Sequence, residues 1–462
     1  MGWGAMRYRP FQIFFGGMFA ANTGGFVYVA ALGWYVLQLT GSPAAVGLAY
    51  AANGLPQLLL TVHAGLFTDR YGARPMVAIG IGAAGILMIV EGLVTLLPNA
   101  PFELILLAAA GCGAAYAVGG PGSMTIVSEL VPPEAMSSSM ALNWLQLNIA
   151  RIAGGLLGGL LLAMTSPALA FAVAGVLNTA PALAILTLKV RPDSASRLVG
   201  PSSMLRPIVE AFRYAWHYPT LGVIVLLAAA PGAIGLSYIF LLSTAASELG
   251  IGANGLGTLI AASGVGGLIA GVALESIQRR FGHGRTLFFG LGLASVALIV
   301  FGFAPNALVA IVTLPFVGAG FVTYAAATAT LIQAMSPARL RGRMVGLFAT
   351  LYWGLLPVGG IVGGAIAQVT SGRTAIMTMG FLMAACAAVT LVARRQIVTL
   401  QVRADGLSLT GDLDGTGVEP EPTAGPATAA EGPESAPAGA APAVPVVPTA
   451  PAPPPAPAPI RG

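Results

Sequence analysis

Twelve long apolar runs, separated by short stretches of turn-forming residues, constrain the fold of this 462-residue chain more than any other feature. A helix needs roughly 20 apolar residues to cross about 30 Å of hydrocarbon. A β-barrel would instead show alternating segments of about ten residues. We therefore expect an all-α membrane protein with twelve transmembrane helices. The runs are 11–38, 43–67, 75–97, 101–128, 137–164, 167–188, 219–246, 252–274, 286–304, 307–332, 343–369 and 373–393.

The composition agrees with lipid as the main solvent. Hydrophobic residues make up 56% of the chain and charged residues only 8%, with a mean hydropathy of +0.85, which is too apolar for a water-soluble globular protein. Cys112 and Cys386 each lie inside an apolar run. We interpret both as small core residues, because no disulfide framework or metal cluster can be built from them.

The arginines and the single lysine predict the orientation, because cations in short loops stay on the cytoplasmic side of a membrane. One arrangement places nearly all of them on one side, and only Arg373 breaks it. Both termini are then cytoplasmic, in a multi-pass protein of a bacterial cell membrane. The cations on that side are Arg7, Arg9, Arg70, Arg74, Lys189, Arg191, Arg197, Arg206, Arg213, Arg279, Arg280, Arg285, Arg339, Arg341, Arg343, Arg394 and Arg395.

The runs divide the chain into four parts. We expect six-helix bundles at 1–188 and 219–395, joined by a central cytoplasmic loop at 189–218. Within this loop, residues 207–219 form either an interfacial helix or a plain linker. The Pro- and Ala-rich tail at 396–462 is expected to be disordered and cytoplasmic. The net charge of +5 suits anionic lipid headgroups, and no nucleic-acid-binding module is visible.

The two bundles are internal repeats. Pro132 and Pro337 lie 205 positions apart, and two GGxxGG segments match at the same offset. A second match, at an offset of 210, relates residues 69–72 to residues 279–282. Parallel repeats of this kind are a recurring plan of secondary transporters. The matched glycines are Gly154, Gly155, Gly158 and Gly159, and Gly359, Gly360, Gly363 and Gly364.

The loop between the second and third runs carries a motif, read as Gly65-Leu66-Phe67-Thr68-Asp69-Arg70-Tyr71-Gly72-Ala73-Arg74. Gly65 permits close helix packing, Gly72 permits a tight turn, and Asp69 offers a carboxylate that can cap a helix N-terminus. At the second loop of a twelve-run pattern, this segment resembles the signature loop of the major facilitator superfamily.

This resemblance implies two pseudo-symmetric six-helix bundles that move a small molecule by alternating access. It also implies a gate in which Asp69 contacts the start of helix 11. In the same gate Arg70 and Arg74 engage an acid at the cytoplasmic end of helix 4, which is Glu129 here. Under the alternative interpretation, the two arginines only set the topology.

Further segments resemble the enterobactin exporter and macrolide efflux branch of that superfamily. They are Leu39–Pro43 and Val131–Gly159, and the resemblance covers roughly residues 10–395. It implies export of an amphiphilic molecule such as a drug or siderophore. The GGxxGG segment of helix 5 resembles an antiporter motif. The interpretation as a plain helix-packing face is equally open. The alternatives are a metabolite importer of the same fold and a sensor or scaffold without transport.

Polar residues inside the runs are candidates for the cavity or for coupling. Arg151 lies near the middle of helix 5, where a charge costs about 3 kcal/mol and needs a partner or water. Trp144, Asn148 and Arg151 share one helical face, which predicts a cavity wall. Glu91 is expected to carry coupling protons, to pair with Arg151 or to be solvated at the outer mouth. The other candidates are Asn22, Gln57, Tyr116, Tyr324, Gln333 and Trp353.

No enzyme class is indicated. The GxGxxG match at 80–85 lies inside helix 3 with no strand before it, so it indicates helix packing. Lys189 is the only lysine and follows leucine, so no phosphate-binding P-loop can be formed. Three scattered histidines give no zinc signature. We expect no cofactor or metal, a monomer in the lipid bilayer, a small-molecule substrate, and protons or another ion for coupling.

Overall fold

The computed structural model describes residues 4–188, 205–337, 340–402 and 409–410. The predictions for residues 189–204 of the central loop, for Arg339 and for residues 411–462 of the tail lie outside the described residues. The first half of the chain forms η1 (Gly4–Arg7), α1 (Arg9–Thr40), α2 (Pro43–Tyr71), α3 (Ala73–Val94), α4 (Phe102–Leu130), α5 (Pro133–Met164) and α6 (Pro167–Leu186). The second half forms α7 (Leu205–His217), α8 (Pro219–Leu227), η3 (Pro231–Gly235), α9 (Tyr238–Glu248), α10 (Gly252–Phe281), α11 (His283–Gly302), α12 (Ala307–Ala334), α13 (Arg341–Gly354), α14 (Leu356–Val369), α15 (Gly372–Ala393), η4 (Arg395–Thr399), β1 (Gln401–Val402) and β2 (Leu409–Thr410).

The helices confirm the prediction of a twelve-span membrane protein. Within the described residues, 11 helical segments are long and apolar enough to cross a bilayer. The number rises to 12 when Pro43–Thr61 and His63–Tyr71, bent by 57° relative to each other, count as one span. Span 7 consists of α8, η3 and α9, and span 11 consists of α13 and α14.

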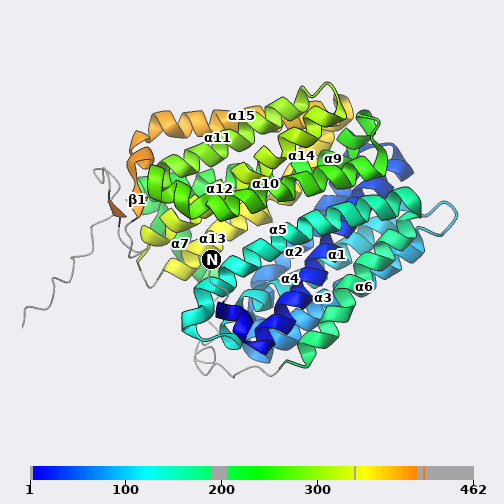
Figure 1. Ribbon diagram of the computed structural model, residues 1–462, viewed down its shortest axis with the longest axis horizontal. Coiled ribbons are helices and arrows are strands. Elements are labelled where there is room, and N and C mark those ends of the chain that lie inside the picture. The colour runs from blue at the N-terminus through cyan, green and yellow to red at the C-terminus, as the bar shows by residue number, and fades with distance from the viewer. Residues whose placement is uncertain (1–3, 189–204, 338–339, 403–408, 411–462) are drawn as a thin grey trace, which may run out of the picture. The chain divides into compact units, whose positions relative to one another are not determined.

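The spans pack as two helical bundles, one containing α1 to α6 and the other α8 to α15 (Figure 1). Two seams join the bundles: α5 lies along α10, and α2 lies along α14. These pairs are equivalent under the internal repeat, because span 5 corresponds to span 11 and span 8 to span 2. The bundles therefore meet through a two-fold-related pair of contacts, as a duplicated chain requires.

The backbone repeats the sequence match in detail. Gly72 and Gly282, which end α2 and α10, have φ/ψ angles of 92°/154° and 80°/163°. Both therefore lie in a positive-φ conformation that favours glycine. Thr165 and Thr370, at the predicted offset, have angles of −134°/−117° and −127°/−97° at the ends of α5 and α14. The two halves thus use the same turns at matching positions.

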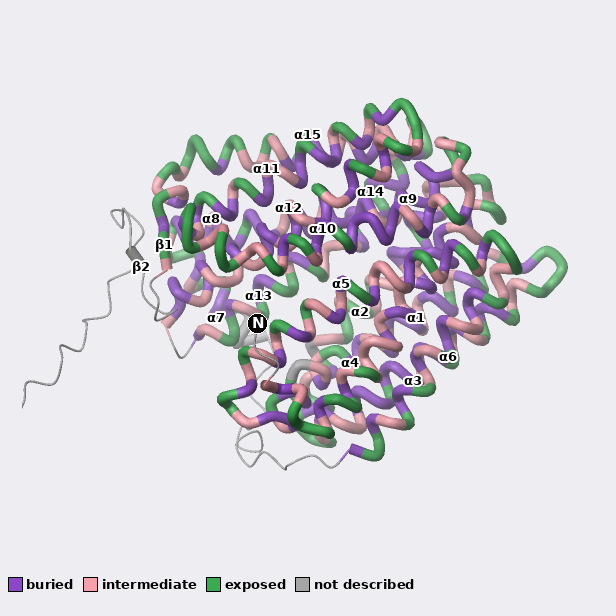
Figure 2. The backbone as a smooth tube through the Cα atoms, viewed as in Figure 1, coloured by how far each residue is buried: buried purple, intermediate pink, exposed green. Residues whose placement is uncertain are grey.

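Apolar side chains cover the outside of both bundles. Leu107, Leu183, Leu308 and Val392 are 65–71% exposed on α4, α6, α12 and α15. In Figure 2, exposed segments alternate with buried ones along these outer helices, as expected for helices with one face toward the core. A surface this apolar is stable only against lipid, so the burial pattern agrees with the hydropathy.

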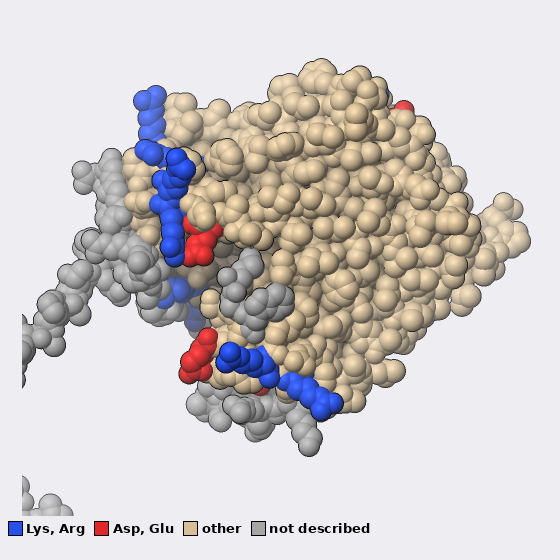
Figure 3. Space-filling model, in the orientation of Figure 1, with Lys and Arg blue, Asp and Glu red and all other residues tan. Residues whose placement is uncertain are grey.

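Charged residues gather at one end of the spans, where α15 ends (Figure 3). We call this the basic end; it contains the start of α3, α11 and α13 and carries Arg70, Arg279, Arg343 and Arg394. The opposite end contains the turns at Gly41, Thr165, Asn306 and Thr370. Among the described residues its only charged side chains are Glu103, Glu248 and Arg373, and we call it the uncharged end for short. The described cations follow this division except for Arg151 within a span and Arg373 at the uncharged end.

Arg373 is tolerated because Glu248 neutralises it. The Arg373 Nε lies 3.5 Å from Glu248 Oε2, and the same carboxylate accepts hydrogen bonds from the backbone N–H groups of Gly372 and Arg373 at the start of α15. The Arg373 guanidinium also donates to the carbonyl of Ala304 at 2.8 Å. Glu248 thus joins the end of α9 to the start of α15.

Replacing Glu248 by glutamine is expected to destabilise the protein by about 1.5–3 kcal/mol, because charge-assisted bonds to the α15 N-terminus are lost. Thermal unfolding in detergent measures this as a lower Tm. Glu275→Gln is the matched control, since Glu275 is exposed and, among the described residues, pairs with Arg279 one helical turn away. Equal Tm values for the two variants would contradict the assignment.

Spans 7 and 11 differ from the unbroken runs expected at 219–246 and 343–369. Pro231 opens a π-helical turn between α8 and α9, and a break at Leu355 separates α13 from α14, where Pro357 follows. Proline lacks an N–H group and clashes with the preceding turn, so it interrupts a helix. Gly232 of the first break packs against the carbonyls of Leu351 and Tyr352 beside the second.

The central loop ends in a helix rather than an irregular linker. In α7, Ala211 and Ala215 are buried, whereas Phe212 and Trp216 are exposed with their rings stacked 5.8 Å apart. Glu210 of α7 forms an ion pair with Arg343 of α13. This amphipathic pattern fits the interfacial interpretation of residues 207–219, although contact with lipid stays a prediction.

The chain is ordered beyond α15, further than the boundary expected at residue 395. Ile397 in η4 and Leu400 are fully buried, and β1 pairs antiparallel with β2. The backbone N–H of Gly284 donates to the carbonyl of Leu400 at 2.9 Å. These apolar residues therefore fix the segment against the start of α11.

Candidate functional site

The GGxxGG segments lie where the helices pack most closely. On α5, a Cβ atom at Gly155 would lie 2.9 Å from the carbonyl oxygen of Gly257 on α10, and one at Gly159 would lie 2.8 Å from the carbonyl of Ala253. Gly154 and Gly158 instead face Thr23 and neighbouring residues of α1. One glycine pair therefore serves the seam between bundles, and the other serves packing within the first bundle.

The segment on α14 repeats this division. Gly360 and Gly364 face Gly47 and Pro43 of α2, across the second seam. Gly359 faces Ala233 of η3 and Ser237, and Gly363 faces Met379 of α15 and Leu241 of α9, all within their own bundle. The plain packing interpretation of the motif thus accounts for all eight glycines, and four of them hold the two bundles together.

Further contacts join the bundles near the uncharged end. The Ser42 hydroxyl donates to the Gln368 side-chain oxygen at 2.7 Å, and the rings of Tyr50 and Phe240 stack 4.1 Å apart. Ser42 and Gln368 lie at the end of the α2–α14 seam. In this state the bundles are closed together on the side of the uncharged end.

A pocket lies between the bundles, on the basic-end side of the seams. About 410 Å³ of space free of atoms lies between its lining residues, and part of this space is open to solvent. Trp144 and Trp353 are 50% and 42% exposed, so their rings stand at its open side. The lining residues come from α5, α9, α12, α13 and the turn before α9. They are Trp144, Leu147, Asn148, Arg151, Leu236, Tyr238, Phe321, Val322, Ala325, Tyr352 and Trp353.

The polar wall of the pocket belongs to α5, and glycines of α10 make room for it. A Cβ atom at Gly264 would lie 3.3 Å from the Arg151 Cβ, and one at Gly267 would collide with the Asn148 amide. The Asn148 amide nitrogen donates to the Trp144 carbonyl at 2.9 Å. These contacts fix the polar face of α5 next to the C-terminal bundle.

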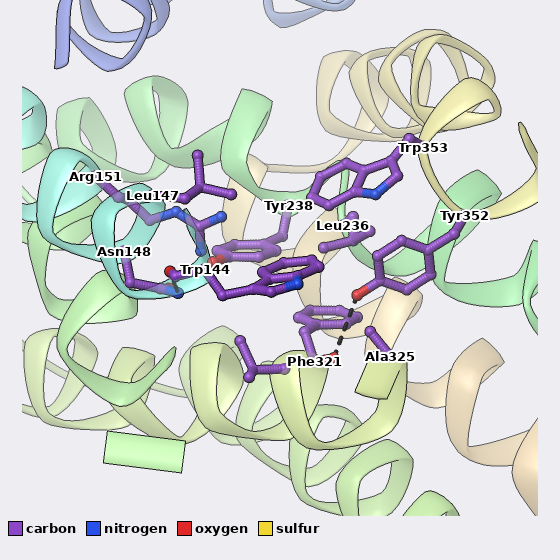
Figure 4. A pocket seen from close by; sticks show the side chains of 11 residues that line it. Trp144, Leu147, Asn148, Arg151, Leu236, Tyr238, Phe321, Ala325, Tyr352 and Trp353 are labelled. Atoms are coloured by element: carbon purple, nitrogen blue, oxygen red, sulfur yellow. Dashed lines mark hydrogen bonds between the residues drawn. The ribbon is translucent and has the colours of Figure 1, made fainter. Parts of the chain in front are cut away.

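The facing wall is aromatic and comes from the C-terminal bundle (Figure 4). The rings of Tyr238 and Phe321 stack 5.9 Å apart and nearly parallel. Those of Tyr352 and Trp353 meet edge-on at 5.2 Å, and the Tyr352 hydroxyl donates to the Phe321 carbonyl at 3.3 Å. Such rings offer flat apolar surfaces that are held in place before a ligand arrives.

Arg151 is the one charged residue among those that line the pocket. Its guanidinium carbon lies 5.2 Å from the centre of the Phe26 ring on α1. Within the described residues, its Nε atom is buried and has no hydrogen-bond partner. A cation inside a span with an unused donor is expensive unless water or a ligand satisfies it.

Four of the ten cavity and coupling candidates line the pocket: Trp144, Asn148, Arg151 and Trp353. The others lie elsewhere, because the sequence reveals a polar residue in a span but not which neighbour covers it. Asn22 donates to Gln146 at 3.4 Å, Tyr116 donates to Asn178 at 2.9 Å, and Gln57 is exposed on α2. Tyr324 is buried behind Tyr352, and the Gln333 carbonyl accepts from Arg341 at 3.1 Å.

Glu91 lies in the interior of the first bundle, away from the pocket. Its side chain has 0% exposure, and neither carboxylate oxygen has a hydrogen-bond partner among the described residues. The expectations of an Arg151 pair and of a solvated position are therefore both wrong. Among the described residues, Tyr28 and Tyr35 of α1 and Cys112 of α4 are ionisable side chains that interact with it. The helices α4 and α6 pack along α3.

The signature loop lies at the basic end of the first bundle. Asp69 and Arg70 are exposed at the end of α2, and Arg74 donates to the Leu188 carbonyl at 2.8 Å. The Asp69 carboxylate has no hydrogen bond or ion pair to a described residue, and residues 338–339 before α13 lie outside the described part. Glu129 is half-buried at the end of α4. The gate stays a prediction.

Most of the aromatic wall of the pocket was not predicted from the sequence, which indicated only Trp353. Tyr238, Phe321 and Tyr352 were not candidates, because aromatic residues inside an apolar run do not stand out from its core. A signal was present: Pro231-Gly232 and Pro357 interrupt spans 7 and 11, and interrupted helices commonly flank binding sites in transporters. Tyr238 and Trp353 lie within a few residues of these breaks.

The chain matches a sequence model of the family described as "Transmembrane secretion effector" over residues 1–404. Taken with the duplicated twelve-span fold, this match settles the family. The chain belongs to it, and with it to the major facilitator superfamily.

Characterised relatives of this transporter cover most of its length. It is 26% identical to the multidrug efflux pump Tap of Mycolicibacterium fortuitum, over 76% of this chain and 88% of that protein. It is 24% identical to the enterobactin exporter EntS of Shigella flexneri, over 68% of this chain and 74% of that protein. The resemblance to the enterobactin-exporter branch is confirmed.

Solved structures show the same fold. The nucleoside transporter NupG matches with a TM-score of 0.68 and 15% identity, over 83% of this chain and 98% of that one. A bacterial homologue of the human lysosomal transporter Spinster matches with a TM-score of 0.66 and 17% identity, over 84% and 97%. At these identities the likeness shows the fold alone.

Proposed function

We propose that this transporter exports a small amphiphilic molecule across a bacterial cell membrane by alternating access, with the described pocket as its binding site. The observation that carries the proposal is the position of the pocket, which is walled by both bundles and lies beside the seams that join them. A ligand held there contacts α5 on one side and α9, α12 and α13 on the other. Tilting of the bundles then changes the side from which it is reached.

The direction of transport is supported by two observations. The relatives at 26% and 24% identity are named as an efflux pump and an exporter. The gathering of arginines at the basic end supports a cytoplasmic position for that end, and we propose the same side for both termini. With the seams closed toward the uncharged end, the pocket in this state receives its ligand from the cytoplasmic side.

The coupling ion and the assembly are also proposals. A monomer is sufficient, since one chain supplies both bundles, both seams and every lining residue of the pocket. Protons are the proposed coupling ion, with the buried Glu91 carboxyl as a candidate carrier inside a span. Chemistry on the substrate is not needed for any of these steps.

Flux measurements in proteoliposomes test the function. The full chain is reconstituted and supplied with fluorescent amphiphiles of different charge, with and without a pH gradient. We expect movement of at least one compound away from the face that carries the N-terminus, and a response to the gradient. Movement toward that face would show an importer, and no protein-dependent flux of any compound would indicate a sensor or scaffold.

Within this assay, Trp353→Ala is expected to weaken the apparent affinity for the transported compound about tenfold. The reason is that a large aromatic surface of the pocket is lost, worth about 1.4 kcal/mol or more. Trp216→Ala is the matched control, because Trp216 lies on the exposed face of α7 outside the pocket. The same change in both variants would argue against a binding role for the pocket.

A further inference from the structure

We infer that the pocket selects aromatic amphiphiles that carry an anionic group, and that Arg151 binds this group while the rings of the C-terminal bundle hold the aromatic body. This inference rests on the proposed transport function and adds the chemical class of the substrate to it.

The charge balance of the pocket is the first observation. Arg151 is its only charged lining residue, and none of the other ten lining residues is acidic. Among the described acids, Glu91 alone lies deep within a span, and it is buried elsewhere in the first bundle. The positive charge of Arg151 is therefore not compensated from within the pocket, which favours an anion over a cation there.

The hydrogen-bonding state of Arg151 is the second observation. A guanidinium has five N–H donors in a planar fork that matches a carboxylate, sulfonate or phosphate. The Nε donor is buried without a described partner. Phe26 covers one face of the group at 5.2 Å, so the ring limits its motion without using its donors. Within the described residues the Nε donor is therefore unused, and we expect an anionic ligand group to satisfy it.

The arrangement of the two walls indicates the chemistry of the remaining, uncharged part of the ligand. Figure 4 shows Arg151 and Asn148 on α5, the Tyr238 and Trp144 rings next to them, and the rings of Tyr352 and Trp353 on the far side. Tyr238 and Tyr352 lie close enough to interact with the Arg151 charge. A ligand with its anion on α5 thus places its aromatic part against the stacked Tyr238 and Phe321 rings.

A pocket built only from aromatic rings would favour cationic dyes, because the faces of the rings attract cations. The nearby guanidinium reverses this preference, since it repels a second cation in the same space and attracts an anion. The substrate then bridges the two bundles, with its anion on the N-terminal bundle and its rings on the C-terminal bundle.

The test uses three probes with the same ring and different charge: 4-(1-pyrenyl)butyrate, 4-(1-pyrenyl)butanol and 4-(1-pyrenyl)butyltrimethylammonium. Their affinity for the full chain in nanodiscs is measured by energy transfer from tryptophan to pyrene, with empty nanodiscs as the blank. We expect the wild type to bind the anion at least about tenfold more tightly than the cation, with the alcohol between them.

Arg151→Gln is expected to lower the affinity for the anion about tenfold, toward that of the alcohol, and to leave the affinity for the alcohol unchanged. Arg151→Lys keeps the charge and is expected to keep the order of the three probes. Arg279→Gln is the matched control, because Arg279 is exposed and distant from the pocket; it should match the wild type. Size-exclusion chromatography checks that each variant is folded.

The inference is overturned if the wild type shows no preference for the anion, if it binds none of the three probes, or if Arg151→Gln retains the full preference. The wild-type comparison decides the matter even if Arg151→Gln does not fold. Failure here is distinct from failure of the transport function. Protein-dependent flux without anion preference would remove only this inference, whereas anion binding without flux would remove transport and leave the Arg151 site.

Discussion

Replacing Gly155 by leucine is expected to reduce transport by about ten- to a hundredfold while both bundles stay folded. A Cβ atom at this position would lie 2.9 Å from the Gly257 carbonyl and from Ile260, and 3.0 Å from the Ala261 nitrogen, all on α10. Backbone atoms cannot give way as a flexible side chain does, so overpacking costs about 1–3 kcal/mol. This overpacking destabilises the conformation in which the α5–α10 seam is closed, relative to the conformation in which it is open.

Two measurements check this expectation. Flux in proteoliposomes gives the loss of transport. Spin labels at Leu97 and Leu308, exposed residues near the uncharged end of each bundle, are expected to report a longer distance in the variant because the seam no longer closes. The labels are introduced into a chain whose two native cysteines are replaced by alanine.

The second seam offers an independent version of the experiment. Gly47 of α2 faces the Gly360 carbonyl of α14, so Gly47→Leu is expected to act like Gly155→Leu. Gly292→Leu is the matched control, because a Cβ atom there has nothing within 4 Å and the neighbouring Phe289 and Val296 are exposed on the outside of α11. Normal flux and closed distances in both seam variants would contradict a role for the seams in the cycle.

Replacing Asp69 by asparagine is expected to slow transport turnover by about tenfold. In the described part, α13 begins at Arg341 without a side-chain cap, and the Asp69 carboxylate is exposed without a partner. A carboxylate at a helix N-terminus is stabilised by the free N–H groups and the helix dipole, and a lost cap costs about 0.5–2 kcal/mol. We expect this contact to form when the bundles close at the basic end.

The measurement is the initial rate of flux at saturating substrate, with binding affinity determined separately. Asp69→Asn should change the rate and leave the affinity near that of the wild type, since Asp69 lies outside the pocket. Glu275→Gln removes another exposed carboxylate at the same end and serves as the control. An unchanged rate in Asp69→Asn would remove the gate assignment.

The positions of the spans were predictable from the sequence because the bilayer imposes a simple rule on every helix. The run expected at 167–188 is α6 at Pro167–Leu186, and the run expected at 307–332 is α12 at Ala307–Ala334. Pro167 opens the first of these helices, and Pro305 and Pro337 flank the second. Membrane thickness and turn chemistry act locally, so they are visible without knowledge of the contacts.

The candidate site was predictable in part. The spacing of Trp144, Asn148 and Arg151 placed them on one face of α5, and all three line the pocket. Helical periodicity is enough for residues of a single helix. It is not enough for Glu91, whose burial depends on how α4 and α6 pack along α3. It is also not enough for Tyr238 and Tyr352, which come from two interrupted spans.

The sequence alone determined the lipid environment, the number of spans, the duplication and the segregation of charge to one end. Each of these follows from hydropathy, from the internal repeat or from the cost of moving a cation across a bilayer. Only the tertiary structure decided which glycine pair of each GGxxGG segment faces the other bundle, and which polar residues share one pocket. The physical reason is that every span is apolar on most of its surface, so its sequence does not distinguish contact with lipid from contact with another helix.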